Sequence, residues 1–99
     1  MARPPMANRI RYVKVEDGVY KSFRRYNGYL VLLYVKLKSF KIIDDLGKSV
    51  VEGTIMGGSH QLKVAAKKAL MKLGVAFKEE GRDNTSRILK KAKEKGLIK

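Results

Sequence analysis

The sequence predicts an α+β fold, in which an antiparallel sheet of four to five strands packs on one helix and a second short basic C-terminal helix follows. In the first half, runs rich in β-branched and aromatic residues are separated by Asp17–Gly18 and Asn27–Gly28, dipeptides that close tight hairpins. In the second half, apolar residues recur at helical spacing after Gly57–Gly58. We expect a mobile arm over 1–8 and a single domain over 9–99.

The strands are predicted from short apolar runs between turn signals. Pro4–Pro5 disfavours a helix in the arm. The alternation of apolar residues changes parity around Lys38–Ser39, after which Phe40 and Ile42 are the apolar alternates, so we predict a bulge or bend there. The Asp44–Lys48 segment is typical of a turn. The predicted strands cover residues 9–16, 19–26, 29–37 and 49–55, with the Phe40–Ile42 segment between the last two.

The helices are predicted from their start and stop signals. Ser59 is a suitable N-cap and Gly74 a suitable left-handed C-terminal residue for the first helix. Asp83 or Asn84 is expected to cap the second helix, which ends before Gly96. The apolar stripe of the first helix is Leu62, Ala66, Ala69, Leu70 and Leu73, and the anchors of the second are Ile88, Leu89 and Ala92.

The two tight turns suggest a strand register. If both are two-residue hairpins, Phe23 faces Leu32 and Tyr12, and Lys14 faces Lys21. The face expected beneath the first helix then holds Val13, Val15, Tyr20, Val31, Leu33, Val35 and Leu37. The opposite face holds Tyr12, Lys14, Lys21, Phe23, Arg25, Leu30, Leu32, Tyr34, Lys36 and Lys38.

This opposite face has two interpretations. Three aromatic rings among basic residues suit single-stranded nucleic acid, because bases stack on rings while cations follow the phosphates. Alternatively the same side chains are core, covered by the second helix or by another subunit, since Leu30 and Leu32 are very apolar for an open platform. Contact between two copies through Leu30 and Leu32 is therefore one expected form of oligomer.

The charge of the chain predicts its class of partner. The chain has twenty-three Lys and Arg residues and nine Asp and Glu residues, which gives a net charge of +14. A polyanion relieves the resulting self-repulsion, and the release of its counterions drives binding. We predict a non-enzymatic, cytoplasmic nucleic-acid-binding protein of low sequence specificity that favours single strands. Lys14, Lys21, Arg25, Lys36 and Lys38 would contact phosphates, Tyr12, Phe23 and Tyr34 would stack on bases, and Lys63, Lys67, Arg87, Lys90 and Lys91 would form a secondary patch.

Other classes of function find little support in the sequence. There is no cysteine and a single histidine, His60, and the Asp44–Asp45 and Glu79–Glu80 pairs are too few for a two-metal nuclease. We therefore expect no enzyme, no metal and no cofactor. The longest apolar run, 29–35, is far too short to span a bilayer, so no membrane partner is expected.

Two alternative functions remain open from the composition. One is an RNA-dependent structural protein of a ribosome or virion. The other is a small inhibitor that binds an acidic protein surface, which for a phage-encoded protein would act in the host cytoplasm. The first is expected to aggregate when alone, and the second to ignore random oligonucleotides.

The pattern Ala65-Ala66-x-x-Ala69-Leu70-x-x-Leu73, preceded by strands and a glycine-rich turn, resembles the last helix of double-stranded RNA-binding domains. The resemblance covers roughly residues 29–73 and implies a strand–strand–strand–helix order. It also implies a helix N-terminus at Gly58–Gln61 that meets a phosphate. The family's first helix is absent here, and only Lys63 approximates the lysine cluster that opens its last helix.

Overall fold

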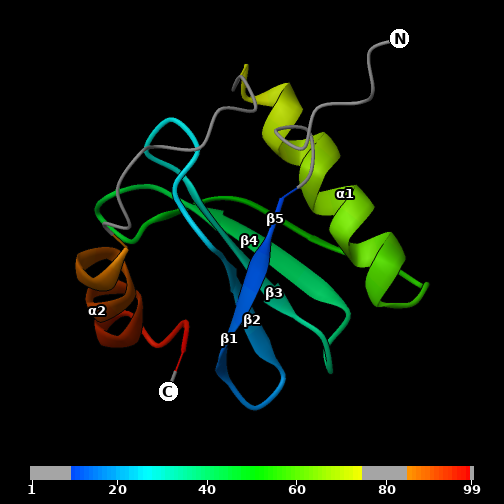
Figure 1. Cartoon of the computed structure of the whole chain (residues 1–99), viewed down its shortest axis with the longest axis horizontal. Coiled ribbons are helices and arrows are strands. Elements are labelled where there is room, and N and C mark those ends of the chain that lie inside the picture. Colours follow the sequence, from blue (N-terminus) through cyan, green and yellow to red (C-terminus); the bar gives the residue numbers. More distant parts are fainter. Residues whose placement is uncertain (1–9, 75–84, 99) are drawn as a thin grey trace, which may run out of the picture.

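A computed structural model describes residues 10–74 and 85–98 and has a helix on each side of a sheet (Figure 1). Each strand pairs antiparallel with the next along the chain, in the order β1-β2-β3-β4-β5. The predicted α+β class is confirmed. The predicted arm over 1–8 lies outside the described residues. The elements are β1 (Tyr12–Glu16), β2 (Val19–Ser22), β3 (Leu30–Tyr34), β4 (Ser39–Ile43), β5 (Ser49–Thr54), α1 (Ser59–Lys72) and α2 (Ser86–Glu94).

Both predicted two-residue turns are present. Asn27 and Gly28 have φ angles of 55° and 85°, and the backbones of Tyr26 and Tyr29 exchange hydrogen bonds of 2.8 and 3.0 Å across them. This pair of positive φ angles is the reason that an Asn-Gly dipeptide closes a hairpin. Gly18, with a φ of 80°, likewise links β1 to β2.

The strand register differs from the prediction in β1. A bulge between Lys14 and Glu16 shifts the pairing by one residue, so Lys14 lies opposite Tyr20 rather than Lys21. A one-residue shift moves every side chain beyond it to the other face. Tyr12 therefore lies on the α1 side of the sheet, and Val15 packs on the α2 side.

A second register difference follows β2, which ends at Ser22 rather than Tyr26. Lys21 pairs with Leu32, a position assigned to Phe23 from the turn alone. Phe23 has left the strand, and its N–H donates to the carbonyl of Arg11 at 2.7 Å. The segment between β2 and the Tyr26–Tyr29 pair is thus two residues longer than the predicted register allows.

The predicted bulge near Lys38–Ser39 is in fact a chain reversal. β3 ends at Tyr34, which pairs with Ser39 of β4, and the four residues between them form a turn. Lys38 adopts a φ of 54°, and Leu37 is 72% exposed. Leu37 was wrongly assigned to the sheet because the apolar run continues past the end of the strand.

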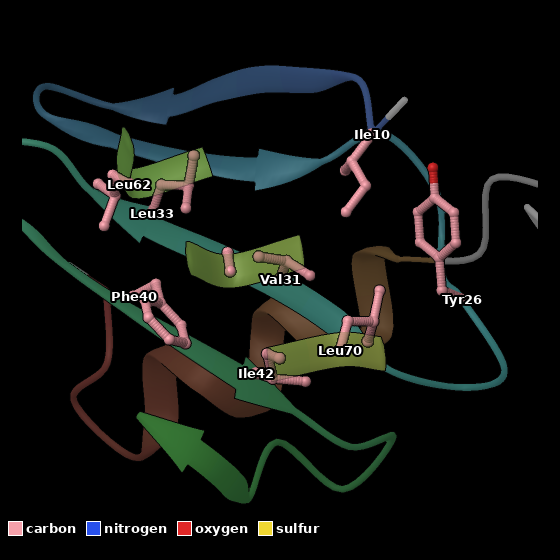
Figure 2. Packing of buried hydrophobic residues seen from close by; sticks show 9 residues of the cluster. Ile10, Tyr26, Val31, Leu33, Phe40, Ile42, Leu62 and Leu70 are labelled. Carbon is pink, nitrogen blue, oxygen red and sulfur yellow. The ribbon is translucent and has the colours of Figure 1, made fainter. Parts of the chain in front are cut away.

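The α1 side of the sheet carries the first core cluster. Leu62, Ala66 and Leu70 form the buried stripe of α1. They pack on four side chains of β3 and β4, as Figure 2 shows, and Ile10 and Tyr26 complete the cluster at its margin. The N-cap of the helix is Gly58 rather than the predicted Ser59, and Gly74 follows the helix with a positive φ of 78°, as predicted. The four sheet residues are Val31, Leu33, Phe40 and Ile42.

The α2 side carries the second core cluster, which confirms that Leu30 and Leu32 are core. Ile88 and Ala92 of α2, with Ile98 beyond it, cover both leucines, whose exposed fraction is 0%. A second copy could reach Leu30 and Leu32 only if α2 left the sheet. The N-cap of α2 is Thr85, whereas the expected caps Asp83 and Asn84 lie outside the described residues.

Two backbone features fix the C-terminal segment against the sheet. After α2, Gly96 has a φ of 79°, and the N–H of Leu97 donates to the carbonyl of Ala92 at 2.9 Å, as in a Schellman motif. In the β4–β5 turn, a Cβ on Gly47 would lie 2.8 Å from Cβ of Lys91. The turn and α2 are therefore in close backbone contact.

A glycine under an aromatic ring gives the first prediction. A Cβ at Gly53 would lie 2.9 Å from the Phe40 ring, which is buried. We expect Gly53→Ala to lower the free energy of unfolding by about 1–3 kcal/mol, because the ring has little room to move. Urea denaturation measures the change. In a Phe40→Leu background the same substitution should cost less, and an equal cost in both backgrounds would contradict this explanation.

Candidate nucleic-acid interface

The three aromatic residues predicted to form one platform are divided between the two sides of the sheet. Tyr12 and Phe23 lie on the α1 side, where they line one groove. Tyr34 lies on the α2 side in the second core cluster. The bulge in β1 and the early end of β2 cause this separation, and the predicted row of stacking rings is therefore wrong.

Tyr34 has a structural role under α2. Its side chain is 8% exposed, and its hydroxyl donates to the carbonyl of Leu97 at 2.7 Å. Burial, with smaller contributions from Glu16 and Glu52, raises the pKa of Tyr34 to about 12. The ring thus holds the C-terminal segment and is not available to a base.

Lys21 is also withdrawn from the surface. It is 7% exposed, and its Nζ donates to the carbonyls of Phe23 at 3.1 Å and Ser22 at 3.3 Å. Backbone carbonyls satisfy the buried ammonium, as a buried charge requires. The predicted phosphate contact at Lys21 is not compatible with this burial.

The described carboxylates all lie on the α2 side of the sheet or in turns beside α2. Glu16 and Asp17 line a pocket with Tyr34 and Leu97. Glu52 of β5 lies opposite Lys41 of β4, which in turn lies opposite Leu32 of β3, so Glu52 shares the α2 side with this core residue. The remaining ones belong to α2 or to the β4–β5 turn that touches it: Asp44, Asp45 and Glu94.

The charged residues of the α1 side are basic within the described ranges. Lys14 shares this side with Tyr20, and Lys38 lies beside the N-terminus of α1. The helix itself contains lysines and no acid. We call this surface the basic face; its cations are Arg11, Lys14, Arg24, Lys38, Lys63, Lys67, Lys68 and Lys72.

A groove of about 530 Å³ opens on the basic face between α1 and the first two strands. The helix lies over β3, β4 and β5, so β1 and β2 border it rather than lie beneath it. The groove is lined by Ile10, Arg11, Tyr12, Val13, Tyr20, Phe23 and Lys63.

Cations lie against the rings of this groove. The guanidinium carbons of Arg11 and Arg24 lie 4.6 and 5.0 Å from the centre of the Phe23 ring. The Nζ of Lys63 lies 5.7 Å from the centre of the Tyr12 ring. The Tyr12 hydroxyl is buried without a hydrogen-bond partner among the described residues, and this burial raises the pKa of Tyr12.

The other predicted site residues are dispersed. Lys36 forms an ion pair with Asp17, and Arg25 is half-buried. Lys63 and Lys67 belong to α1, whereas the other members of the predicted secondary patch lie on α2, across the sheet. The prediction of one patch is therefore wrong, since the sheet separates its two halves. Those on α2 are Arg87, Lys90 and Lys91.

The sequence prediction missed part of the groove. Arg11, Tyr20 and Arg24 line it or contact its rings, and none was predicted as a site residue. Tyr20 lies on the predicted side of the sheet, but α1 lies over β3–β5, so Tyr20 lines the groove beside the helix. The regular alternation over 12–16 gives no sign of the β1 bulge that brings Tyr12 to the same side. The position of Arg11 and Arg24 next to Tyr12 and Phe23 in the chain was the available signal.

Residues 10–74 and 85–98 hold neither a metal-binding cluster nor a helix that could span a membrane. No three His, Asp or Glu side chains of these ranges come together where they could hold a metal ion. Neither α1 nor α2 has the length and apolar character that a membrane span requires. His60 is exposed in the first turn of α1.

Comparisons with known proteins give no relative from which a function can be transferred. No family model, no curated protein and no solved structure matches this chain.

The hydroxyl of Tyr34 gives the second prediction. Tyr34→Phe removes its hydrogen bond to Leu97 and should lower the free energy of unfolding by about 1 kcal/mol. Tyr12→Phe is the matched control, because it removes a buried hydroxyl that has no partner among the described residues and should leave stability unchanged or raised. Chemical denaturation compares the two, and a larger loss in the Tyr12 variant would contradict these assignments.

The third prediction concerns alkaline pH. In the unfolded chain Tyr34 loses its proton near pH 10, whereas in the folded chain it keeps the proton until about pH 12. The unfolded state thus binds fewer protons in this window, so stability falls as pH rises through it. Tyr34→Phe should make this fall shallower in denaturation curves measured from neutral to alkaline pH. Identical pH profiles for the two proteins would show that Tyr34 contributes nothing to the fall.

Proposed function

We propose that this protein binds nucleic acid with low sequence specificity through its basic face. The observation that carries the proposal is the segregation of charge. The described carboxylates lie on the α2 side or in turns beside α2, while α1 adds four lysines, Lys63, Lys67, Lys68 and Lys72, and no acid to the other side. The described residues on this side attract a polyanion and add no carboxylate that would repel it, and the polyanion releases counterions as it binds.

The distribution of these cations favours an extended polyanion over a small anion. Lys63 lies at the groove, whereas Lys68 and Lys72 lie on the opposite flank of α1, near β5. Contacts spread across a helix suit a phosphate backbone, whose charges repeat along its length. Phosphate contacts position a protein without reading sequence, which supports low specificity.

The two alternatives make different predictions for the same measurement. An RNA-dependent structural protein would also bind phosphates. Unlike the proposed protein, it would assemble into one particular particle, such as a ribosome or virion. An inhibitor of an acidic protein would leave random oligonucleotides unbound. Binding of unrelated oligonucleotides therefore separates the proposal from the inhibitor.

The fourth prediction tests the basic face with two variants of equal net charge. Lys68→Gln/Lys72→Gln removes two exposed cations from α1, and Lys93→Gln/Lys95→Gln removes two exposed cations in or just after α2. Fluorescent oligonucleotides are titrated at several salt concentrations. The α1 variant should bind more weakly, and its plot of log affinity against log salt should be about one to two units shallower.

The α2 variant serves as the control for bulk charge. It should stay close to the native protein in both affinity and salt slope, apart from the small loss common to both variants. Equal losses in the two variants would mean that net charge and not the basic face drives binding. A native protein that binds no oligonucleotide at low salt would overturn the proposal itself.

A further inference from the structure

We propose that the groove between α1 and the first two strands holds one unstacked nucleobase of a single strand, with its phosphates on the rim cations. This inference rests on the proposed function and names the part of nucleic acid that the basic face takes. The size of the groove, its aromatic lining and the cations against its rings each support it.

The groove is large enough to admit a base. Its volume of about 530 Å³ lies within the range of pockets that hold small organic ligands. Tyr12 and Tyr20 are half-buried neighbours on the same side of the sheet, and Phe23, which follows β2, also lines the groove. A planar base entering here would meet aromatic surface, on which stacking tolerates any base.

The cations of the groove are placed to hold the phosphates of that nucleotide. Arg11 and Arg24 both contact the Phe23 ring, and Lys63 contacts the Tyr12 ring from α1. Each charge lies over the face of a ring. A base that stacks on that ring therefore displaces the cation from its face and leaves it beside the phosphates of the same nucleotide. No carboxylate is among the described residues that line the groove.

This arrangement favours single strands. In a duplex the base faces are stacked on their neighbours and are not free to enter a groove, whereas a single strand presents them. A duplex would thus contact only the cations of the basic face. We expect single strands to gain affinity from the rings in addition to the phosphate contacts.

A tryptophan probe tests the proposal directly. The chain has no tryptophan, so Phe23→Trp places a single one in the groove, and Leu37→Trp places one in the exposed β3–β4 turn as a control. Oligothymidylate and an abasic oligomer of equal length supply the same phosphates with and without bases. Oligothymidylate should quench the fluorescence of the Phe23→Trp variant, and it should leave that of the Leu37→Trp variant nearly unchanged.

Affinities for the same two oligomers complete the test. The native protein should bind oligothymidylate about fivefold or more tightly than the abasic oligomer, because stacking adds to the phosphate contacts. Phe23→Leu keeps apolar bulk but removes the ring, so it should lower this ratio without lowering affinity for the abasic oligomer. Circular dichroism confirms that each variant is folded.

The outcomes separate the two proposals. Equal affinity of the native protein for both oligomers, or binding of oligothymidylate to the Phe23→Trp variant without quenching of its fluorescence, would overturn the nucleobase groove and leave the proposed function standing. Failure to bind either oligomer would overturn the proposed function as well. A Phe23→Leu variant that keeps the native ratio would likewise exclude the ring as the stacking surface.

Discussion

The burial of β3 on both faces is the constraint on which the rest of the structure depends. Every residue of this strand, Leu30–Tyr34, is buried. Such a strand needs cover on each side of the sheet, as do the strands of sheets that lie between layers of helices. α1 covers Val31 and Leu33, and α2 with the following segment covers the other three. The centre of the sheet is thereby closed to a ligand on both sides.

The closed centre determines which surfaces remain for binding. They are the outer faces of the helices and the margin of the sheet that α1 does not cover. On the α2 side, Asp17 pairs with Lys36 and Glu52 lies 3.3 Å from Lys41, so part of the positive charge is balanced locally. On the α1 side the described residues supply cations and no carboxylate. An excess of one charge on one side raises the energy of the compact state, and a polyanion bound there lowers it.

Both helices and most strands could be predicted from the sequence, but the reversal between β3 and β4 could not. The side of the sheet on which each side chain lies could be predicted only in part. Positive φ at Asn27–Gly28 and the apolar spacing of α1 are local properties, so the hairpin and the stripe of Leu62, Ala66 and Leu70 were predicted correctly. The side of the sheet on which Tyr12 lies depends on a bulge with no residue signature. Side chains alternate between the two faces of a sheet only while the strand is regular, and one irregular residue reverses the faces of all residues beyond it.

The same bulge explains why the groove has the lining that it does. A single helix is about 10–12 Å wide and strands are about 4.8 Å apart, so α1 cannot cover all five strands. It lies over β3–β5, and the α1 side of β1 and β2 is left at the margin. In a regular β1, Val15 would lie at this margin and Tyr12 and Lys14 would lie on the α2 side. The bulge instead sends Val15 to the core under α2 and brings Tyr12 to the margin beside Lys63, which produces aromatic surface edged by cations.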